Sequence, residues 1–310
     1  MASLGQMFGA GDTETFMGVP RCRDLSRLAS RVAILGADCA TPYASAGAYC
    51  AGGAAAIRAG AADYAANLSH HHFDLGGIGW PDGHVSDAGD LPQDPDDASG
   101  NRARLFGAVE QILGKDGLPV ILGGDDSVTI PVLEAYAGRG AFTLLQVDAH
   151  IDWRDEVQGE RMGLSSVMRR ASEMSHVASI VQVGQRGLGS ARPQDVRAAT
   201  DWGVGFVPGG EVARDGVGRA VDLVPDGADV VVCFDFDALD PSIMPAVIAR
   251  TAGGLRYWQA LELLAGVASK ARIAGVVFTE FMAPRDIDGM GAATAAQIVI
   301  ATLGILARQR

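Results

Sequence analysis

The sequence has no excess of basic residues and no long apolar run, and both absences narrow the partners it can have. Lys and Arg together number 25 against 37 Asp and Glu, which gives a formal net charge of -12. Nucleic acids and anionic membranes bind basic surfaces, so neither is an expected partner. No apolar run reaches the roughly 18 residues of a membrane-spanning helix, and the N-terminus lacks a basic segment followed by an apolar stretch. We therefore expect a soluble, cytoplasmic protein.

Cysteine is also scarce. The chain has four cysteines, at positions 22, 39, 50 and 233, and no Cys-x-x-Cys spacing. Cys39 and Cys233 lie in or beside apolar runs, which indicates buried thiols in a reducing compartment. A disulfide framework is not expected.

Short apolar runs alternate with helical patterns along the chain. The runs are typical of strands covered on both faces, and the helical patterns repeat apolar residues at helical spacing. We predict strands at 32–35, 118–122, 142–147, 180–183, 205–207, 230–234 and 274–278, and helices at 101–113, 130–136, 166–174, 257–268 and 292–307. This alternation favours an α/β fold, a three-layer α/β/α sandwich with a central, mostly parallel sheet.

The chain shows no internal repeat and no linker that would divide it. We expect its 310 residues to form a single domain, with residues 1–30 as an N-terminal arm. Residues 76–100 are rich in Gly, Pro and Asp and are predicted to form an irregular surface excursion.

Two acidic segments are the most informative feature of the sequence. Asp148, His150 and Asp152 alternate in one segment, and Asp235 and Asp237 alternate in the other. Residues i, i+2 and i+4 of an extended strand share a face, so these side chains can converge. Acidic clusters also cap helices and fill turns, but two clusters that each end an apolar run favour a site for two divalent cations.

Polar residues follow four of the predicted strands. In open α/β sheets the ligand site lies beyond the carboxyl ends of the strands. The residues concerned are Gly123–Ser127, Asp148–Asp152, Asp235–Pro241 and Glu280. The four strand ends are therefore expected to face one crevice.

These segments resemble the motifs of a known family, the ureohydrolases, which include arginases and agmatinases. Gly124–Thr129 resembles the family motif GGDHS, Asp148–Asp152 matches DAHxD, and Asp235–Pro241 matches DxDxxDP. Weaker echoes are Gly52–Arg58, Asp87–Asp90, and Glu280 followed by Pro284, Asp286 and Gly289. The resemblance covers nearly the whole chain and implies an arginase-like fold.

The resemblance also implies a two-metal site. One metal ion would be held by Asp126, Asp148, Asp152 and Asp235, and the other by Asp148, His150, Asp235 and Asp237. Asp148 and Asp235 would bridge the two ions.

The implied reaction is hydrolysis of a guanidinium group by a water molecule that the two cations activate. Asp152 and Glu280 are the predicted catalytic residues. Glu280 would also grip the guanidinium with both carboxylate oxygens, the alternative being a surface glutamate. Asp240, which precedes Pro241, is expected to bind backbone in a turn.

The sequence departs from the family pattern at three places. The family histidine of GGDH is Asp126 here, so five carboxylates face the four charges of two divalent ions; as an alternative, Asp126 caps the following helix. Arg161–Ser166 replaces a His-Gly-Thr segment of many agmatinases. Ala246–Gly254 replaces a Gly-Thr-Gly-Thr-Pro stretch, and its Arg250 is either a substrate-binding residue or a solvated surface arginine.

Two functional hypotheses follow from the resemblance. The first is a metal-dependent amidinohydrolase that cleaves an agmatine-like guanidino compound to urea and an amine. Oxygen-rich ligation favours manganese, with nickel as an alternative. The second is a non-catalytic or weakly active subunit of a heteromeric guanidine or biguanide hydrolase of the metformin type. The resemblance implies a trimer or hexamer, or a hetero-oligomer with a related subunit; a purely structural α/β module is a third, less favoured hypothesis.

Overall fold

The computed structural model describes residues 14–189 and 191–309. The strands are β1 (Val32–Ala37), β2 (Val85–Asp90), β3 (Leu118–Gly123), β4 (Phe142–Val147), β5 (Val177–Val183), β6 (Gly205–Val207), β7 (Asp229–Asp235) and β8 (Arg272–Thr279). The α-helices are α2 (Gly53–Ala62), α3 (Ala98–Leu113), α4 (Thr129–Glu134), α5 (Val167–Ala171), α6 (Pro193–Trp202), α7 (Gly209–Asp215), α8 (Gly218–Leu223), α9 (Tyr257–Lys270) and α10 (Met290–Arg308).

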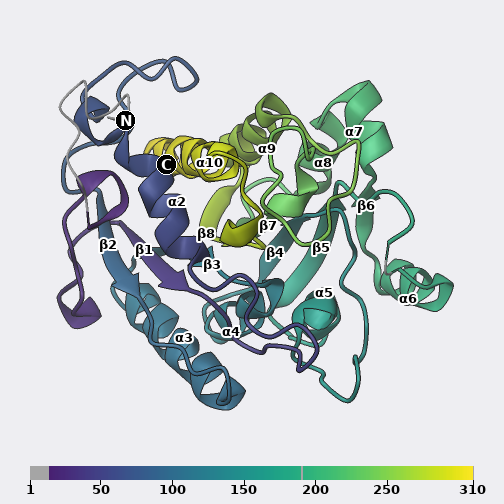
Figure 1. Cartoon of the computed structure of the whole chain (residues 1–310). Coiled ribbons are helices and arrows are strands. Elements are labelled where there is room, and N and C mark those ends of the chain that lie inside the picture. Colours follow the sequence, from purple (N-terminus) through teal and green to yellow (C-terminus); the bar gives the residue numbers. More distant parts are fainter. Residues whose placement is uncertain (1–13, 190, 310) are drawn as a thin grey trace.

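The strands form one eight-stranded sheet in the order β2-β1-β3-β8-β7-β4-β5-β6 (Figure 1). All neighbouring strands in this sheet pair in parallel. The predicted α/β sandwich is confirmed, and each of the seven predicted strands is present. The five predicted helices are also present, although α4 and α5 are shorter than the patterns indicated.

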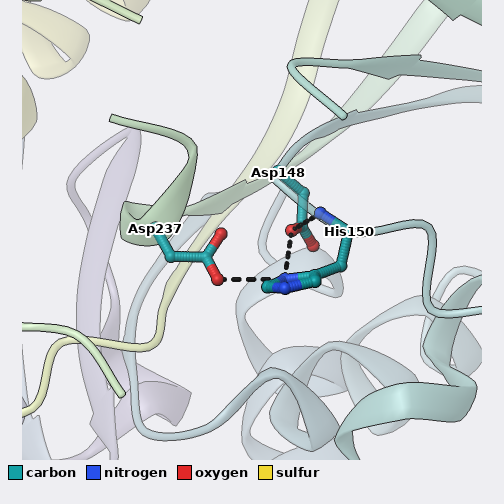
Figure 2. A group of neighbouring side chains, drawn as sticks. All are labelled: Asp148, His150 and Asp237. Carbon is teal, nitrogen blue, oxygen red and sulfur yellow. Dashed lines mark hydrogen bonds and ion pairs between the residues drawn. The ribbon is translucent and has the colours of Figure 1, made fainter. Parts of the chain in front are cut away.

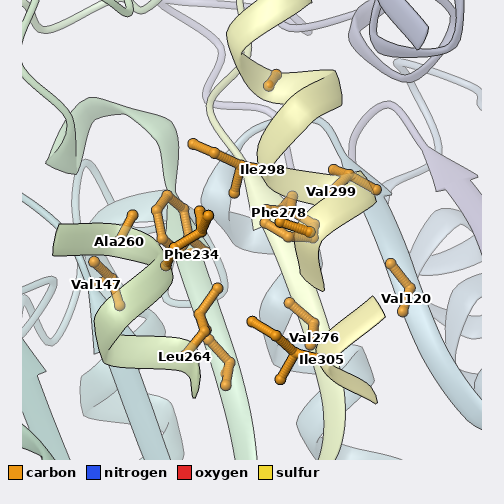
Figure 3. Close-up of a cluster of buried hydrophobic side chains, with 14 of the residues drawn as sticks. Val120, Val147, Phe234, Ala260, Leu264, Val276, Phe278, Ile298, Val299 and Ile305 are labelled. Carbon is orange, nitrogen blue, oxygen red and sulfur yellow. The ribbon is translucent and has the colours of Figure 1, made fainter. Parts of the chain in front are cut away.

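Helices cover both faces of the sheet. α2, α9 and α10 lie on one face, and α3, α4 and α5 lie on the other (Figure 1). On the first face the rings of Phe234 and Phe278 pack under Ile298 of α10 (Figure 3). On the second face Cys233 and Val277, their neighbours in the chain, join a separate core. Successive side chains thus alternate between two apolar layers, which explains the continuous apolar runs.

The prediction of an irregular excursion at residues 76–100 was wrong in part, because β2 lies within it. β2 pairs with β1 at the edge of the sheet. Its sequence contains one β-branched residue, Val85, so it carries little local strand signal. A buried ion pair holds β2 in place despite its low strand propensity. Arg58 Nε lies 2.8 Å from Asp87 Oδ2, and the same guanidinium also binds Asp90.

The described part of the N-terminal arm is packed against the domain. Phe16 and Met17 are buried, and the backbone N–H of Phe16 donates to Asp87 Oδ2 at 2.8 Å. Residues 1–13 of the predicted arm lie outside the described residues.

α10 is the one described helix that is long and apolar enough to cross a membrane by length and composition. Its mean hydropathy is 1.8, and 72% of the window is buried inside the fold. α10 lies beside α2 and α9 (Figure 1), so burial between helices and sheet accounts for its composition.

Candidate metal centre

The carboxyl ends of four adjacent strands bring the predicted polar segments together. β3, β8, β7 and β4 are consecutive in the sheet and parallel, so their ends meet at one edge. Seven buried carboxylates gather there: Asp125, Asp126, Asp148, Asp152, Asp235, Asp237 and Glu280. The prediction that four strand ends face one site is confirmed.

The first close group of possible metal ligands is Asp148, His150 and Asp237 (Figure 2). His150 Nδ1 lies 3.0 Å from Asp237 Oδ2 and 3.4 Å from Asp148 Oδ1. Backbone amides orient both carboxylates, because His150 N donates to Asp148 at 2.6 Å and Ala149 N donates to Asp237 at 3.1 Å.

The second close group is Asp126, Asp148 and Asp152. Asp126 Oδ1 accepts hydrogen bonds from Thr129 at 3.0 Å, Cys233 at 3.1 Å and Thr279 at 3.2 Å. Its other oxygen, Oδ2, is buried and has no hydrogen-bond partner among the described residues. The helix-cap alternative for Asp126 is not borne out, since Asp125 is the residue that caps the turn at 126–128.

Asp235 is the remaining predicted ligand. It is buried beside both groups but belongs to neither of them. Its Oδ1 accepts a hydrogen bond from Asp237 N at 2.6 Å. Asp148 is common to both groups, as a bridging ligand would be, whereas the bridging role of Asp235 stays a prediction.

Burial and mutual repulsion control ionisation at this edge. Burial raises the pKa of Asp126 to about 6. Burial and the neighbouring carboxylates also raise the pKa of other members well above the usual range, namely Asp148, Asp152, Asp235 and Glu280. So many like charges out of water are unfavourable without cations.

The imidazole compensates for part of this charge. Burial alone would lower the pKa of His150, but its hydrogen bond and attraction to Asp237 raise the pKa to about 9. Burial likewise opposes ionisation of Asp237, yet His150 holds the pKa of Asp237 below its usual value. Carboxylate oxygens with one imidazole nitrogen are a donor set for hard divalent cations, and the unpartnered Asp126 Oδ2 fits the same purpose.

Two residues of the site have left-handed backbones. Asp152 has φ +41° and Glu280 has φ +67°. Such values are strained for residues other than glycine and cluster at functional sites.

A pair of glutamines beneath the carboxylates was not predicted. Gln146 Nε2 donates to Asp148 Oδ2 at 2.6 Å and to Asp152 Oδ2 at 2.7 Å. Gln182, its partner in register on β5, donates to Gln146 Oε1 and to the carbonyl of Ile151. The sequence did hold a signal for this pair, because each glutamine interrupts an apolar strand and Gln146 lies two residues before Asp148.

Glu280 is buried, so the alternative of a surface glutamate is wrong. Its carboxylate accepts hydrogen bonds from the backbone N–H of Asp126 at 3.0 Å and from the phenol of Tyr49. Tyr49 lies outside the recognised motifs, and its place in the site was not predicted.

Arg250 does not face the carboxylates as a substrate-binding role would require. Its guanidinium is exposed and donates to the carbonyls of Pro245 at 2.6 Å and Arg285 at 3.1 Å, which fastens two loops together. The substrate-binding prediction for Arg250 therefore has no support in this geometry.

The structural role expected of Asp240 is confirmed, because its carboxylate accepts hydrogen bonds from the backbone N–H groups of Ser242 and Gly253.

All four cysteines lie within the described residues and are free thiols. Cys39, Cys50 and Cys233 are buried, as predicted for Cys39 and Cys233. Burial raises the pKa of the Cys233 thiol, which therefore donates to Asp126 as a neutral group.

The fold and the site together define a parallel α/β protein with a buried carboxylate and imidazole cluster suited to divalent cations. Comparison with known proteins makes this specific: the model of the arginase family matches residues 30–304, and the chain belongs to that family. The predicted family is thereby confirmed.

Curated relatives carry the names of guanidine-cleaving enzymes. The chain is 36% identical over 187 residues to N(1)-aminopropylagmatine ureohydrolase of Thermus thermophilus, which covers 60% of this chain and 61% of that protein. It is 30% identical over 232 residues to the human mitochondrial guanidino acid hydrolase, covering 71% of this chain and 63% of that protein. The matches thus span about three-fifths of the length of these relatives.

Solved structures show the same fold. Proclavaminate amidino hydrolase from Streptomyces clavuligerus superposes with a TM-score of 0.85 at 25% identity and covers 97% of this chain and 99% of that chain. Arginase from Bacillus caldovelox superposes with a TM-score of 0.68 at 20% identity and covers 91% of this chain and 99% of that chain. The predicted arginase-like architecture is confirmed.

Proposed function

We propose that this chain is a metal-dependent amidinohydrolase that cleaves a guanidino compound, agmatine-like in its reacting group, to urea and an amine. The observation that carries the proposal is the pair of close ligand groups that share Asp148 at the carboxyl ends of the central strands. Family membership and the names of the relatives support the same reaction class.

The side chains have separable roles in this proposal. Asp126, Asp148, Asp152 and Asp235 would hold one divalent cation, and Asp148, His150, Asp235 and Asp237 the other. When bound, the two ions would supply Lewis acidity and a water of lowered pKa. Carboxylate-rich ligation favours manganese over softer ions, with nickel as the alternative.

Glu280 is proposed to receive the guanidinium group. Its carboxylate is buried at the same edge. Burial is the main cause of its raised pKa, and the negative charges of Asp125 and Asp237 raise the pKa further. A cationic group with two parallel N–H donors would pair with both oxygens and relieve that repulsion. Asp152 is held by Gln146 against Asp148, which is consistent with its predicted catalytic role.

A cavity beside the cluster suggests where the rest of the substrate lies. It has a volume of about 380 Å³ and borders His150, with Ile151, Val196 and Phe206 among its walls. None of the described residues that line it has a carboxylate, so the terminal amine of agmatine would find no counter-ion there. We therefore expect n-butylguanidine, which is agmatine without that amine, to have the lower KM of the two.

Metal content and urea release test the proposal together. Elemental analysis of protein purified with manganese should give two ions per chain. Asp148→Asn should lose both ions and all urea release, because Asp148 belongs to both groups. Asp229→Asn, at the opposite end of β7 and paired with exposed Arg272, is the matched control and should keep both. Wild-type protein without metal would contradict the proposal.

The subunit hypothesis makes a different prediction. A non-catalytic partner would release urea only after mixing with a related chain, whereas the proposed enzyme releases it alone. The favoured assembly is a homo-oligomer, a trimer or hexamer, which sedimentation of the purified chain would test.

A further inference from the structure

Tyr49 lies directly in front of the Glu280 carboxylate. The phenol oxygen is 2.6 Å from Glu280 Oε1 and 2.7 Å from Oε2. An atom almost equidistant from both oxygens lies near the bisector of the carboxylate. A guanidinium that pairs bidentately with a carboxylate must approach along that same line. The phenol and the guanidinium therefore cannot occupy Glu280 together.

We propose that Tyr49 occupies the guanidinium position on Glu280, so that any ligand of this carboxylate, the substrate included, must first displace the phenol. This inference rests on the proposed function, in which Glu280 receives the guanidinium.

The surroundings of Tyr49 favour a donating phenol over an anion. Burial, followed by the charge of Glu280, raises the pKa of the Tyr49 phenol. The O–H proton therefore stays on Tyr49 and stabilises the carboxylate as a hydrogen-bond donor. Without a substrate, this contact and the Asp126 N–H are two neutral interactions that reduce the cost of a buried charge.

The chain around Tyr49 allows the ring to leave. Residues 44–47 are exposed, and Tyr49 itself is half-buried, whereas the next residue, Cys50, is fully buried. Gly52, with φ +80°, then turns the chain into α2. The ring can swing outward from a fixed point at Cys50 without unpacking the core.

The carboxylates around Glu280 decide which ligand can displace the phenol. A guanidinium brings a positive charge into a pocket of negative charges. Its attraction to these charges outweighs the loss of the phenol hydrogen bond. Urea, the neutral product, has similar N–H donors but no charge, so it competes poorly with Tyr49. Tyr49 therefore raises the Kd of both ligands by the same factor, and only the charged substrate keeps enough affinity to displace the phenol.

Calorimetric titration of manganese-loaded protein with guanidinium chloride and, separately, with urea tests the inference. Tyr49→Phe keeps the ring but removes the competing O–H. The Kd for guanidinium should fall about tenfold, as expected for loss of a hydrogen bond to a charged group. Urea binding should strengthen by a similar factor. Tyr43→Phe removes a phenol from the same segment that hydrogen-bonds Ser165 instead, and should leave both constants unchanged.

Glu280→Gln separates failure of this inference from failure of the proposed function. If Glu280→Gln leaves guanidinium binding unchanged, Glu280 is not the guanidinium site and both ideas fall. If Glu280→Gln weakens binding while Tyr49→Phe leaves it unchanged or weaker, only the role of Tyr49 is overturned. Tyr49→Leu is the second variant should Tyr49→Phe fail to fold, and the same tightening is expected.

Discussion

Two buried charge clusters in this domain differ in how their charges are balanced. At the β1–β2 edge, Arg58 meets Asp87 and Asp90, so a buried guanidinium offsets the carboxylates within the chain. At the carboxyl ends of β3, β8, β7 and β4, seven carboxylates find one imidazole and neutral donors such as Gln146 and Tyr49. The first cluster is complete as a structural element, and the second requires cations from outside.

Raised carboxylate pKa values therefore mark the cluster at the strand ends, and not the cluster around Arg58, as a functional site. A buried ion pair needs its partner to remain folded, but it needs nothing from solution. A cluster of like charges at strand ends raises its own pKa values and gains stability when a cation binds. Changes to the first cluster should therefore alter stability without altering metal content, and changes to the second should alter metal content.

The largest expected effect on stability is at the balanced cluster. Arg58→Met would leave Asp87 buried without its partner and should lower the free energy of unfolding by about 3–5 kcal/mol. Chemical denaturation measures this change, and the manganese content of the folded variant should stay at that of wild type. Arg272→Met breaks an exposed pair with Asp229 and should cost about 0–1 kcal/mol. Equal costs would remove the distinction between buried and exposed pairs.

The metal-free protein should become less stable as pH rises from about 4 to 6. The pKa of Asp126 is raised to about 6 in the folded state, so the folded state holds this proton where the unfolded state has lost it. Stability from this group is therefore present below the unfolded pKa and is lost as pH rises through the folded pKa, by up to about 3 kcal/mol.

Thermal unfolding at a series of pH values, with and without manganese, measures this effect. Bound cations should remove the decline between pH 4 and 6 or reverse it. A metal-free protein whose stability rises over that interval would contradict the charge argument for the second cluster.

Loss of the glutamine beneath the second cluster should weaken metal binding without breaking the fold. Gln146→Met keeps the side-chain length but removes the donor shared by Asp148 and Asp152. Groups that orient metal ligands typically contribute about 10–100-fold to metal affinity. Manganese titration should show a loss in that range, and Gln111→Met, on the exposed face of α3, should show none.

The smallest effect is expected from Asp126→His. Removing one negative charge from the cluster should lower the pKa of the attacking water, and so move the acid limb of the pH profile of urea release down by about one pH unit, within the range that a neighbouring charge produces. A pH profile of wild type and variant measures it directly. An unmoved limb would mean that the surplus charge of Asp126 does not reach the reacting water.

The sequence predicted those parts of the site that depend on strand ends. Asp148, His150 and Asp237 lie together because they directly follow neighbouring parallel strands, whose carboxyl ends meet at one edge. The expected alternation along an extended strand is not what aligns them, since β4 ends at Val147 and Asp237 lies in a 3-10 turn. The apolar runs of β3, β4, β7 and β8 were long enough to be recognised without ambiguity. The central sheet and its carboxylates were therefore accessible from pattern alone.

Features that depend on distant contacts were not predictable. β2 is a strand because β1 and Arg58 make it one, and its own residues favour a turn. Gln146 and Tyr49 act through partners 6 and 231 positions away in the chain, which periodicity does not report. Arg250 was predicted to approach the site from its position in a motif loop, but nearby carbonyls hold its guanidinium.

The position of β8 has a consequence for how the molecule is made. β8 pairs with β3 on one side and β7 on the other, so it is the strand that joins the two halves of the sheet. Asp126 belongs to one half, and Asp148 and Asp235 belong to the other. During synthesis, which proceeds from the N-terminus, both halves emerge from the ribosome before the strand that unites them. The ligands proposed for the ion that Asp126 shares with Asp148 are thus brought together only when nearly the entire polypeptide has been translated.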